Sequence, residues 1–187
     1  MSEARTPRRI VTGVRDGRSV FLGDDEVPNC HHYQGWPGFM TSVIWATAPV
    51  PQIPLTPGDE PAPTGRDVVP GPGETRLMIV RFPPDAVFAD PRFDPATLDR
   101  EQAFHLNSLA ATFEQDDPGM HRTNSVDYDI VLENEIWLEL DDGDTRHMRQ
   151  GDVAIQGGGR HAWRNKSDKP TLMCFVLIGA ERSGGAN

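Results

Sequence analysis

The sequence predicts an all-β protein, built as a sandwich or a closed barrel, and three observations support this. Turns are frequent, because 18 glycines and 17 prolines occur in 187 residues. Between residues 120 and 178, short β-rich runs alternate with turn signals, a spacing typical of sandwiches and barrels. A helical pattern of apolar residues occurs only over residues 95–115. Since a small open sheet leaves exposed edges, closure is favoured.

Composition excludes several partners. The chain has 18 Lys plus Arg against 28 Asp plus Glu, a formal net charge of −10. This acidic balance argues against nucleic acid and against an anionic membrane surface, both of which require basic faces. No apolar run is long enough to span a membrane, and no signal peptide is visible. The two cysteines indicate no disulfide framework, so a reducing, cytoplasmic setting is expected.

The first part of the chain predicts strands followed by an arm. Two β-rich runs, residues 9–13 and 19–23, flank an Asp-Gly pair and predict a hairpin, and residues 40–47 predict another strand. The proline-rich stretch 49–73 is either a surface arm that reaches a second subunit or a disordered linker. We expect residues 1–75 to pack on a barrel formed by residues 76–180, with a disordered tail at 181–187.

The second part predicts one helix and then the barrel strands. Asp94 is a plausible N-cap before Pro95, and residues 116–119 end the helical pattern. A strong hairpin turn follows at residues 141–144. The predicted strands are 76–82, 127–132, 135–140, 145–150, 153–155, 161–164 and 171–178.

Two blocks of this region carry residues suited to chemistry, 119–135 and 151–165. Residues two apart on a strand share a face, so His121, Thr123 and Asp127 point the same way, as do His161 and Trp163. In a small barrel the inward faces of two such strands converge. Two imidazoles and a carboxylate there could hold a divalent ion with open positions, or act without metal as a general acid–base pair.

The two blocks resemble the paired motifs of the cupin superfamily, specifically its small single-domain cupin-2 type. His121 takes the place of the first motif's first histidine, and Asp127 that of its glutamate. The second motif matches best in GDVAIQGGGRHAWRN, through Gly151, Gly158, His161 and Asn165. The resemblance implies a cupin-type double-stranded β-helix (jelly-roll) barrel with an N-terminal extension and one or two short helices. It also implies a homodimer formed by exchange of N-terminal strands.

The departures from the family pattern limit what the resemblance implies about metal. Thr123 stands where the family has its second metal-binding histidine, and Asp127 is one methylene shorter than glutamate. The remaining candidate ligands are His121, His161 and Asp127, with Asp129 as a substitute carboxylate. A divalent metal (Fe, Mn, Ni or Zn) and no metal at all both stay open.

For function, the resemblance implies a cupin-type small-molecule enzyme. Within that range we expect a lyase or isomerase, dehydratase-like or decarboxylase-like, acting on a small oxygenated substrate. Dioxygenase chemistry is less favoured, because the histidine set is incomplete. The alternative is a non-catalytic ligand-binding cupin with a degenerate metal site.

The candidate residues fall into two groups. His121, His161 and Asp127 are the predicted catalytic residues, and Trp163, Thr123, Tyr128 and Arg164 are predicted to bind substrate. Arg122, Arg160 or Arg164 could pair with a substrate carboxylate at the barrel mouth. For residues 30–32, Cys-His-His, a loop is preferred over a metal cluster, because adjacent side chains diverge.

Overall fold

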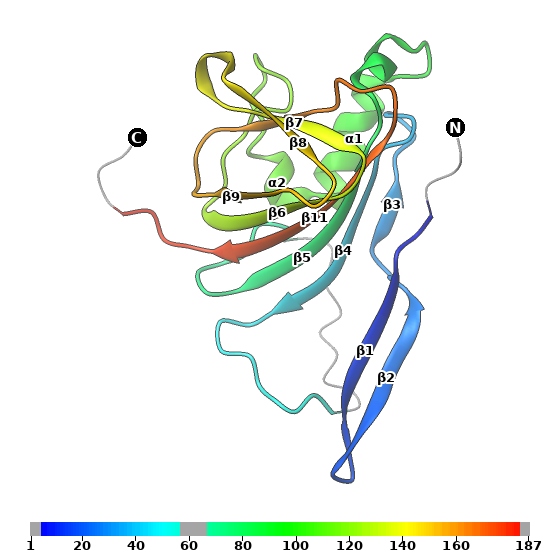
Figure 1. Ribbon diagram of the computed structural model, residues 1–187, viewed down its shortest axis with the longest axis vertical. Coiled ribbons are helices and arrows are strands. Elements are labelled where there is room, and N and C mark those ends of the chain that lie inside the picture. Colours follow the sequence, from blue (N-terminus) through cyan, green and yellow to red (C-terminus); the bar gives the residue numbers. More distant parts are fainter. Residues whose placement is uncertain (1–4, 57–66, 184–187) are drawn as a thin grey trace.

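The computed structural model describes residues 5–56 and 67–183 (Figure 1). The N-terminal strands are β1 (Arg8–Arg15), β2 (Arg18–Glu26), β3 (Cys30–His32), β4 (Met40–Thr47) and β5 (Thr75–Phe82). The short helices η1 (Asp85–Ala89), α1 (Pro95–His105) and α2 (Asn107–Ala110) follow. The remaining elements are β6 (Ser125–Glu133), β7 (Glu135–Glu139), η2 (Asp141–Gly143), β8 (Thr145–Arg149), β9 (Val153–Gln156), β10 (Ala162–Arg164) and β11 (Thr171–Gly179).

The strands from β3 onward form the two layers of a jelly-roll barrel. One sheet has six strands in the order β3-β4-β5-β11-β6-β9, and the other has three in the order β10-β7-β8. Figure 1 shows the small sheet lying over the β6–β9–β11 part of the large one, with α1 and α2 closing the side of the opening. The predicted cupin-type double-stranded β-helix is therefore confirmed, including its two short helices.

The N-terminal hairpin is a separate feature. Strands β1 and β2 pair only with each other, and Figure 1 shows them projecting away from the barrel. Their turn uses Asp16 and Gly17, both with positive φ (51° and 74°), which is the backbone that a tight two-residue hairpin requires. The predicted hairpin is confirmed.

Two apolar clusters hold the barrel together. The larger one lies between β4, β5, β11 and the helices, and includes Tyr33, Phe39, Met78, Leu98 and Leu106. The smaller one lies between the two sheets and consists of Val131, Ile136, Met148 and Met173. Ile136 and Met173 are fully buried. The two clusters meet through Phe82 and Phe175, which pack against both.

The predicted helix over residues 95–115 is shorter than expected. Asp94 is its N-cap, as predicted, and its side chain accepts hydrogen bonds from the backbone N–H groups of Ala96 and Thr97. The helix breaks at Leu106 (φ −122°, ψ 33°), α2 adds one further turn, and the chain continues without regular structure. Of the apolar residues in α1, Leu98 alone is buried and Phe104 is 72% exposed, so the pattern does not correspond to one packed face.

Other N-terminal predictions have mixed outcomes. The proline-rich stretch is loop over residues 48–56 and 67–74, while residues 57–66 lie outside the described ranges, as do residues 1–4 and 184–187 of the predicted frayed ends. The preference for a loop at residues 30–32 is wrong, because they form strand β3 against β4. The domain boundaries stay a prediction. Within the described ranges, no helix is long and apolar enough to cross a membrane.

Candidate functional site

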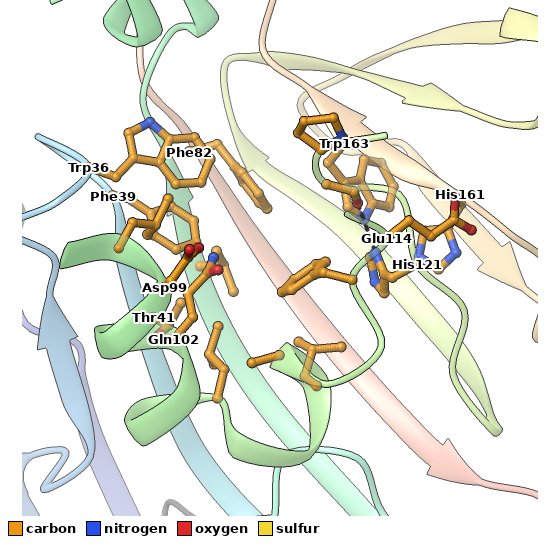
Figure 2. A pocket seen from close by; sticks show the side chains of 18 of the residues that line it. Trp36, Phe39, Thr41, Phe82, Asp99, Gln102, Glu114, His121, His161 and Trp163 are labelled. Carbon is orange, nitrogen blue, oxygen red and sulfur yellow. Dashed lines mark hydrogen bonds between the residues drawn. The ribbon is translucent and has the colours of Figure 1, made fainter. Parts of the chain in front are cut away.

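A cavity of about 1080 Å³ opens between the barrel and the two short helices. Figure 2 shows its two ends: Trp36, Phe39, Thr41, Asp99 and Gln102 gather at one, and His121, His161, Trp163 and Glu114 at the other. Aromatic and aliphatic side chains from both sheets line the space between them. The cavity is therefore mostly apolar with polar groups at its two ends, which is the usual character of a small-molecule site.

The two predicted histidines lie side by side. His121 and His161 form an antiparallel bridge in which each backbone N–H donates to the other residue's carbonyl, at 3.0 and 2.9 Å. Because directly paired residues project to the same side, their rings meet, with centroids 4.4 Å apart and planes tilted by 50°. The prediction that two imidazoles from separate motif blocks meet inside the barrel is confirmed.

Backbone carbonyls determine which ring nitrogen carries the proton. The Nδ1 atoms of His121 and His161 lie 3.0 Å from the carbonyl oxygens of Gly119 and Gly159. Since a carbonyl only accepts hydrogen bonds, each Nδ1 is the donor, and each neutral ring keeps its lone pair on Nε2. Burial, with His161 beside it, lowers the pKa of His121 to about 4, and burial also lowers the pKa of His161. Both rings are therefore neutral at neutral pH.

Two aspartates on β6 face the same cavity. Asp127 and Asp129 are 5% and 1% exposed, and both line the space. Thr123 donates to Asp127 Oδ2 at 3.4 Å, and Ser125 donates to Thr123 at 2.8 Å, so a short hydroxyl chain holds Asp127. Neither oxygen of Asp129 has a hydrogen-bond partner. Burial, and then the neighbouring Asp127, raises the pKa of Asp129 to about 8, so its carboxyl group is protonated at neutral pH.

These donors do not fit the metal centre of a typical cupin. Two imidazole Nε2 lone pairs would be suitable ligands, but a stable site needs at least a third. Across the described residues, no three His, Cys, Asp or Glu side chains are placed to hold one ion. Thr123 fills the position of the missing histidine and binds Asp127 through its hydroxyl. The predicted ligand set of His121, His161 and Asp127 is therefore not assembled.

The predicted substrate-binding residues separate into two groups. Thr123, Trp163 and Arg164 line the cavity, whereas Tyr128 does not: it alternates with Asp127 and Asp129, points to the outer face of β6, and is 41% exposed. Trp163 packs edge-on against His161, with ring centroids 6.4 Å apart.

The predicted arginines are already engaged. Arg160 binds Glu114, Asp117 and Asp141, and Arg164 binds Glu139, Asp117 and the carbonyl of Pro118. Arg122 is exposed and lies outside the cavity lining. The structure thus gives Arg160 and Arg164 the role of fixing the loop before His121, instead of leaving them for a substrate carboxylate.

No pattern in the sequence indicates the aromatic end of the cavity. Trp36 stacks between Phe39 and Phe88, at 4.2 and 5.1 Å, and Phe93 packs edge-on against Phe88. Asp99 and Gln102, three residues apart on α1, face this end (Figure 2). These residues come from three separate segments, none of which has a recognisable motif, so only the folded chain brings them together.

The barrel has the double-stranded β-helix fold of cupins, and the sequence relatives include proteins named for a cupin domain. Phomopsin biosynthesis cluster protein C' of Diaporthe leptostromiformis is 56% identical over 63 residues, 33% of each chain. The cupin-domain-containing oxidoreductase virC of Hypocrea virens is 48% identical over 62 residues, 32% of each chain. These matches span about a third of the relatives' length. The cupin-domain-containing oxidoreductase fogC of Aspergillus ruber is 28% identical over 178 residues, 94% of this chain and 73% of its own.

Solved structures overlap with the chain more loosely. A Cupin 2 conserved barrel domain protein from Salinispora arenicola has a TM-score of 0.38 and 18% identity, covering 64% of this chain and 71% of that one. A putative ethanolamine utilization protein from Salmonella typhimurium has a TM-score of 0.42 and 11% identity, covering 95% and 100%. No family model matches the chain. The chain has a cupin-type barrel, and over 94% of its length it is similar, at 28% identity, to a protein named as a cupin-domain-containing oxidoreductase.

Proposed function

We propose that this protein is a small-molecule enzyme that moves protons on an oxygenated substrate, as a lyase or isomerase. One observation carries the proposal: two neutral imidazoles face each other in a mostly apolar cavity, each with its Nε2 lone pair free of any hydrogen bond within the described chain. An unprotonated imidazole in such a cavity can accept a proton from carbon next to a carbonyl group.

The protonated carboxyl of Asp129 supplies the complementary acid. In a dehydration, Nε2 of His161 or His121 takes the proton from the carbon next to the carbonyl, and that electron pair forms the new double bond. The hydroxyl group on the next carbon leaves with a proton from Asp129, as water. A base and an acid whose pKa values are shifted by burial are a recurrent arrangement in enzymes.

Isomerisation uses the same groups, with the proton returned to a different carbon. Both reactions leave the oxidation level of the substrate unchanged, so they require only groups that this chain supplies. Trp163 and the aromatic end of the cavity would position an apolar substrate body beside the histidines.

The test is deuterium uptake from D₂O into a panel of aryl ketones and aryl β-hydroxyketones, followed by NMR, with water loss followed by mass spectrometry. We expect uptake next to the carbonyl above the buffer rate, and loss of at least about a hundredfold of it in His161→Gln. His147→Gln, on the outer face of the small sheet and stacked on Trp137, is the matched control and should retain full activity.

Two other functions predict different results. Two of the sequence relatives are named oxidoreductases, which favours a net oxidation. Oxygen consumption or a change of two mass units with the same panel, dependent on added metal, would support that reading and overturn ours. Binding of panel members without any uptake, water loss or oxidation would instead identify a non-catalytic ligand-binding cupin.

We also propose that the protein is a homodimer. The β1–β2 hairpin stands away from the barrel and exposes Phe21 and Ile10, which are 74% and 52% accessible in one chain. A second copy that receives this hairpin would cover both side chains. Light scattering should give twice the mass of one chain. In Phe21→Asp the measured mass should fall towards that of a single chain. A strict monomer at high concentration would contradict the proposal.

A further inference from the structure

The charges around the cavity carry an inference about the substrate, and it rests on the proposed function. Five carboxyl groups line the cavity: Asp85, Asp99, Glu114, Asp127 and Asp129. Arg164 is the sole Lys or Arg among the described lining residues. The whole chain is acidic as well, with a formal net charge of −10. Asp129 is protonated and Glu114 pairs with Arg160, so the negative charge of the cavity comes from the remaining aspartates, Asp85, Asp99 and Asp127.

Arg164 contributes little positive charge to the cavity, because each of its three guanidinium nitrogens already donates to an oxygen of the protein. Its Nε donates to Glu139, one terminal nitrogen donates to the carbonyl of Pro118 at 2.6 Å, and the other to Asp117 at 3.3 Å. Glu139 and Asp117 neutralise it on the side away from the cavity. A substrate carboxylate could bind it only by displacing one of them, and would then leave that carboxylate partly buried without its partner.

The histidines offer no positive charge either. Their Nδ1 protons are held by backbone carbonyls, and burial lowers both of their pKa values. An anion beside them would meet two Nε2 lone pairs and Asp127, although the protonated Asp129 could donate one hydrogen bond to it. A hydroxyl or ammonium group, in contrast, could donate a hydrogen bond to Nε2 or to a carboxylate.

The aromatic end of the cavity also disfavours an anionic group. Asp99 faces the cavity from α1, and no described residue hydrogen-bonds or pairs with its carboxylate. Beside it lie the rings of Trp36, Phe88 and Phe93. Aromatic faces attract cations and apolar rings, and they do not compensate an anion.

We propose that the cavity selects aromatic substrates that are uncharged or carry an amine, and that it rejects carboxylates. The chemistry of the lining recognises a planar apolar body with hydrogen-bond donors at its ends. This restricts the oxygenated substrates of the proposed reaction to alcohols, phenols, ketones and aldehydes, with or without an amino group.

The experiment compares three probes with the same ring system: naphthylmethanol, naphthylmethylamine and naphthoate, each titrated into the full chain by isothermal calorimetry. The alcohol and the amine should bind, and naphthoate should bind at least about tenfold more weakly, because each like-charge contact in a partly buried site costs roughly that factor. Equal binding of all three, tighter binding of naphthoate, or no binding by any of them would overturn the proposal.

Two variants locate the charge that is responsible. Asp99→Asn should strengthen the binding of naphthoate and weaken the binding of naphthylmethylamine by roughly two- to fivefold each. The affinity for naphthylmethanol should stay unchanged. Glu139→Gln removes a partner of Arg164 and should also strengthen naphthoate. Asp168→Asn makes the same charge change on an exposed loop and is the matched control. If Asp99→Asn and Asp168→Asn act alike, the selectivity reflects total charge and the proposed site is wrong.

The binding and the activity can fail separately. Charge selectivity without deuterium uptake would leave the substrate class standing and remove the proton-transfer function. Uptake into aryl ketones by a protein that binds naphthoate as tightly as the alcohol would do the reverse.

Discussion

The two walls of the cavity are built differently. The strand wall carries the residues of the proposed reaction, and these side chains are almost fully inaccessible: Asp129 is 1% exposed, and Thr123 and His161 are each 3% exposed. Strand β6, which carries Asp129, is hydrogen-bonded on both sides, to β11 and to β9. The helix wall, α1 and α2, buries Leu98 in α1 and no residue in α2.

Polar contacts hold the helix wall. The Glu101 carboxylate accepts the backbone N–H groups of Gln34 and Gly35, each at 2.9 Å, and pairs with His31 at 3.0 Å. His105 of α1 stacks on His31, with ring centroids 3.6 Å apart, so it is partly covered. Gly35 permits the close approach, because a Cβ there would lie 2.3 Å from the Leu98 backbone nitrogen.

The difference indicates separate roles for the two walls. A wall held by strand ladders and close packing keeps the histidines and aspartates in place. A wall that buries few side chains besides Leu98 and Leu106 can open locally at lower cost, since elements with few buried apolar contacts unfold first. Ligand entry past the helices is the consequence, and the following experiments test the contrast.

The largest expected effect comes from the strand side. Ile136→Ala removes a fully buried side chain from the cluster between the sheets and should lower the free energy of unfolding by about 2–5 kcal/mol. Leu109→Ala, a partly buried residue of the helix wall, should cost less than half as much. Urea denaturation of both variants measures this. Equal losses would mean that the helices are as firmly packed as the sheets.

The pH dependence of stability should reveal the protonation state of Asp129. Its pKa is raised from 3.8 to about 8 in the folded chain, so the folded state holds a proton that the unfolded state has lost. Stability should therefore fall as the pH rises between these two values. Asp129→Asn removes this titration and should be more stable than the parent above about pH 8, by an amount on the order of a few kcal/mol.

Chemical denaturation of the parent and of Asp129→Asn across this pH range gives the comparison. Asp152→Asn, on an exposed turn, serves as the control for removing one carboxylate. If the two curves run parallel from acid to alkaline pH, Asp129 is ionised in the folded protein and cannot be the proposed acid.

Loosening the helix wall should have a smaller and local effect. Burial opposes ionisation of Glu101, but the N–H groups of Gln34 and Gly35, together with His31, outweigh it and lower the pKa of Glu101. The stabilisation is thus complete at neutral pH and is lost only as the pH falls below about 4.5. Glu101→Gln should destabilise the helix wall by about 1–2 kcal/mol, mostly because local opening of α1 becomes easier.

Hydrogen exchange read by mass spectrometry distinguishes local from global opening. In Glu101→Gln, peptides from α1, α2 and residues 33–36 should exchange faster, while β6 and β11 keep the protection of the parent. Faster exchange throughout the barrel would show that the helix wall is part of the cooperative core.

Much of the strand wall was predictable, and little of the helix wall was. Alternation along a strand placed His121, Thr123 and Asp127 on one face, because a strand has a fixed two-residue period. The same period put Tyr128 outside, so its expected substrate contact does not form. The helix wall has no such constraint: Glu101 finds its partners sixty-odd residues earlier in the chain, and no local pattern encodes that contact.

The predicted ligand set of His121, His161 and Asp127 is not assembled for a related reason. Sequence spacing aligned Asp127 with a family glutamate, but spacing cannot show whether a carboxylate reaches two imidazoles. In the folded chain Asp127 accepts a hydrogen bond from the Thr123 hydroxyl. The arginines are similar, because a charge near a cavity mouth is available to substrate only if no carboxylate of the protein already pairs with it, as Asp117 does with both.

The smallest effect tests the start of the helix wall. Asp94 caps α1 by accepting from the N–H groups of Ala96 and Thr97 at 3.1 and 3.3 Å, and from the Thr97 hydroxyl at 2.6 Å. Asp94→Ala should cost about 1 kcal/mol, the usual loss for a cap, and Asp94→Ser should restore most of it. If the helix wall opens independently of the barrel, this loss appears in hydrogen exchange of α1 and leaves the urea midpoint almost unchanged. A shift of the urea midpoint that accounts for the full loss would instead show that α1 unfolds together with the barrel. Ligand entry would then require another route.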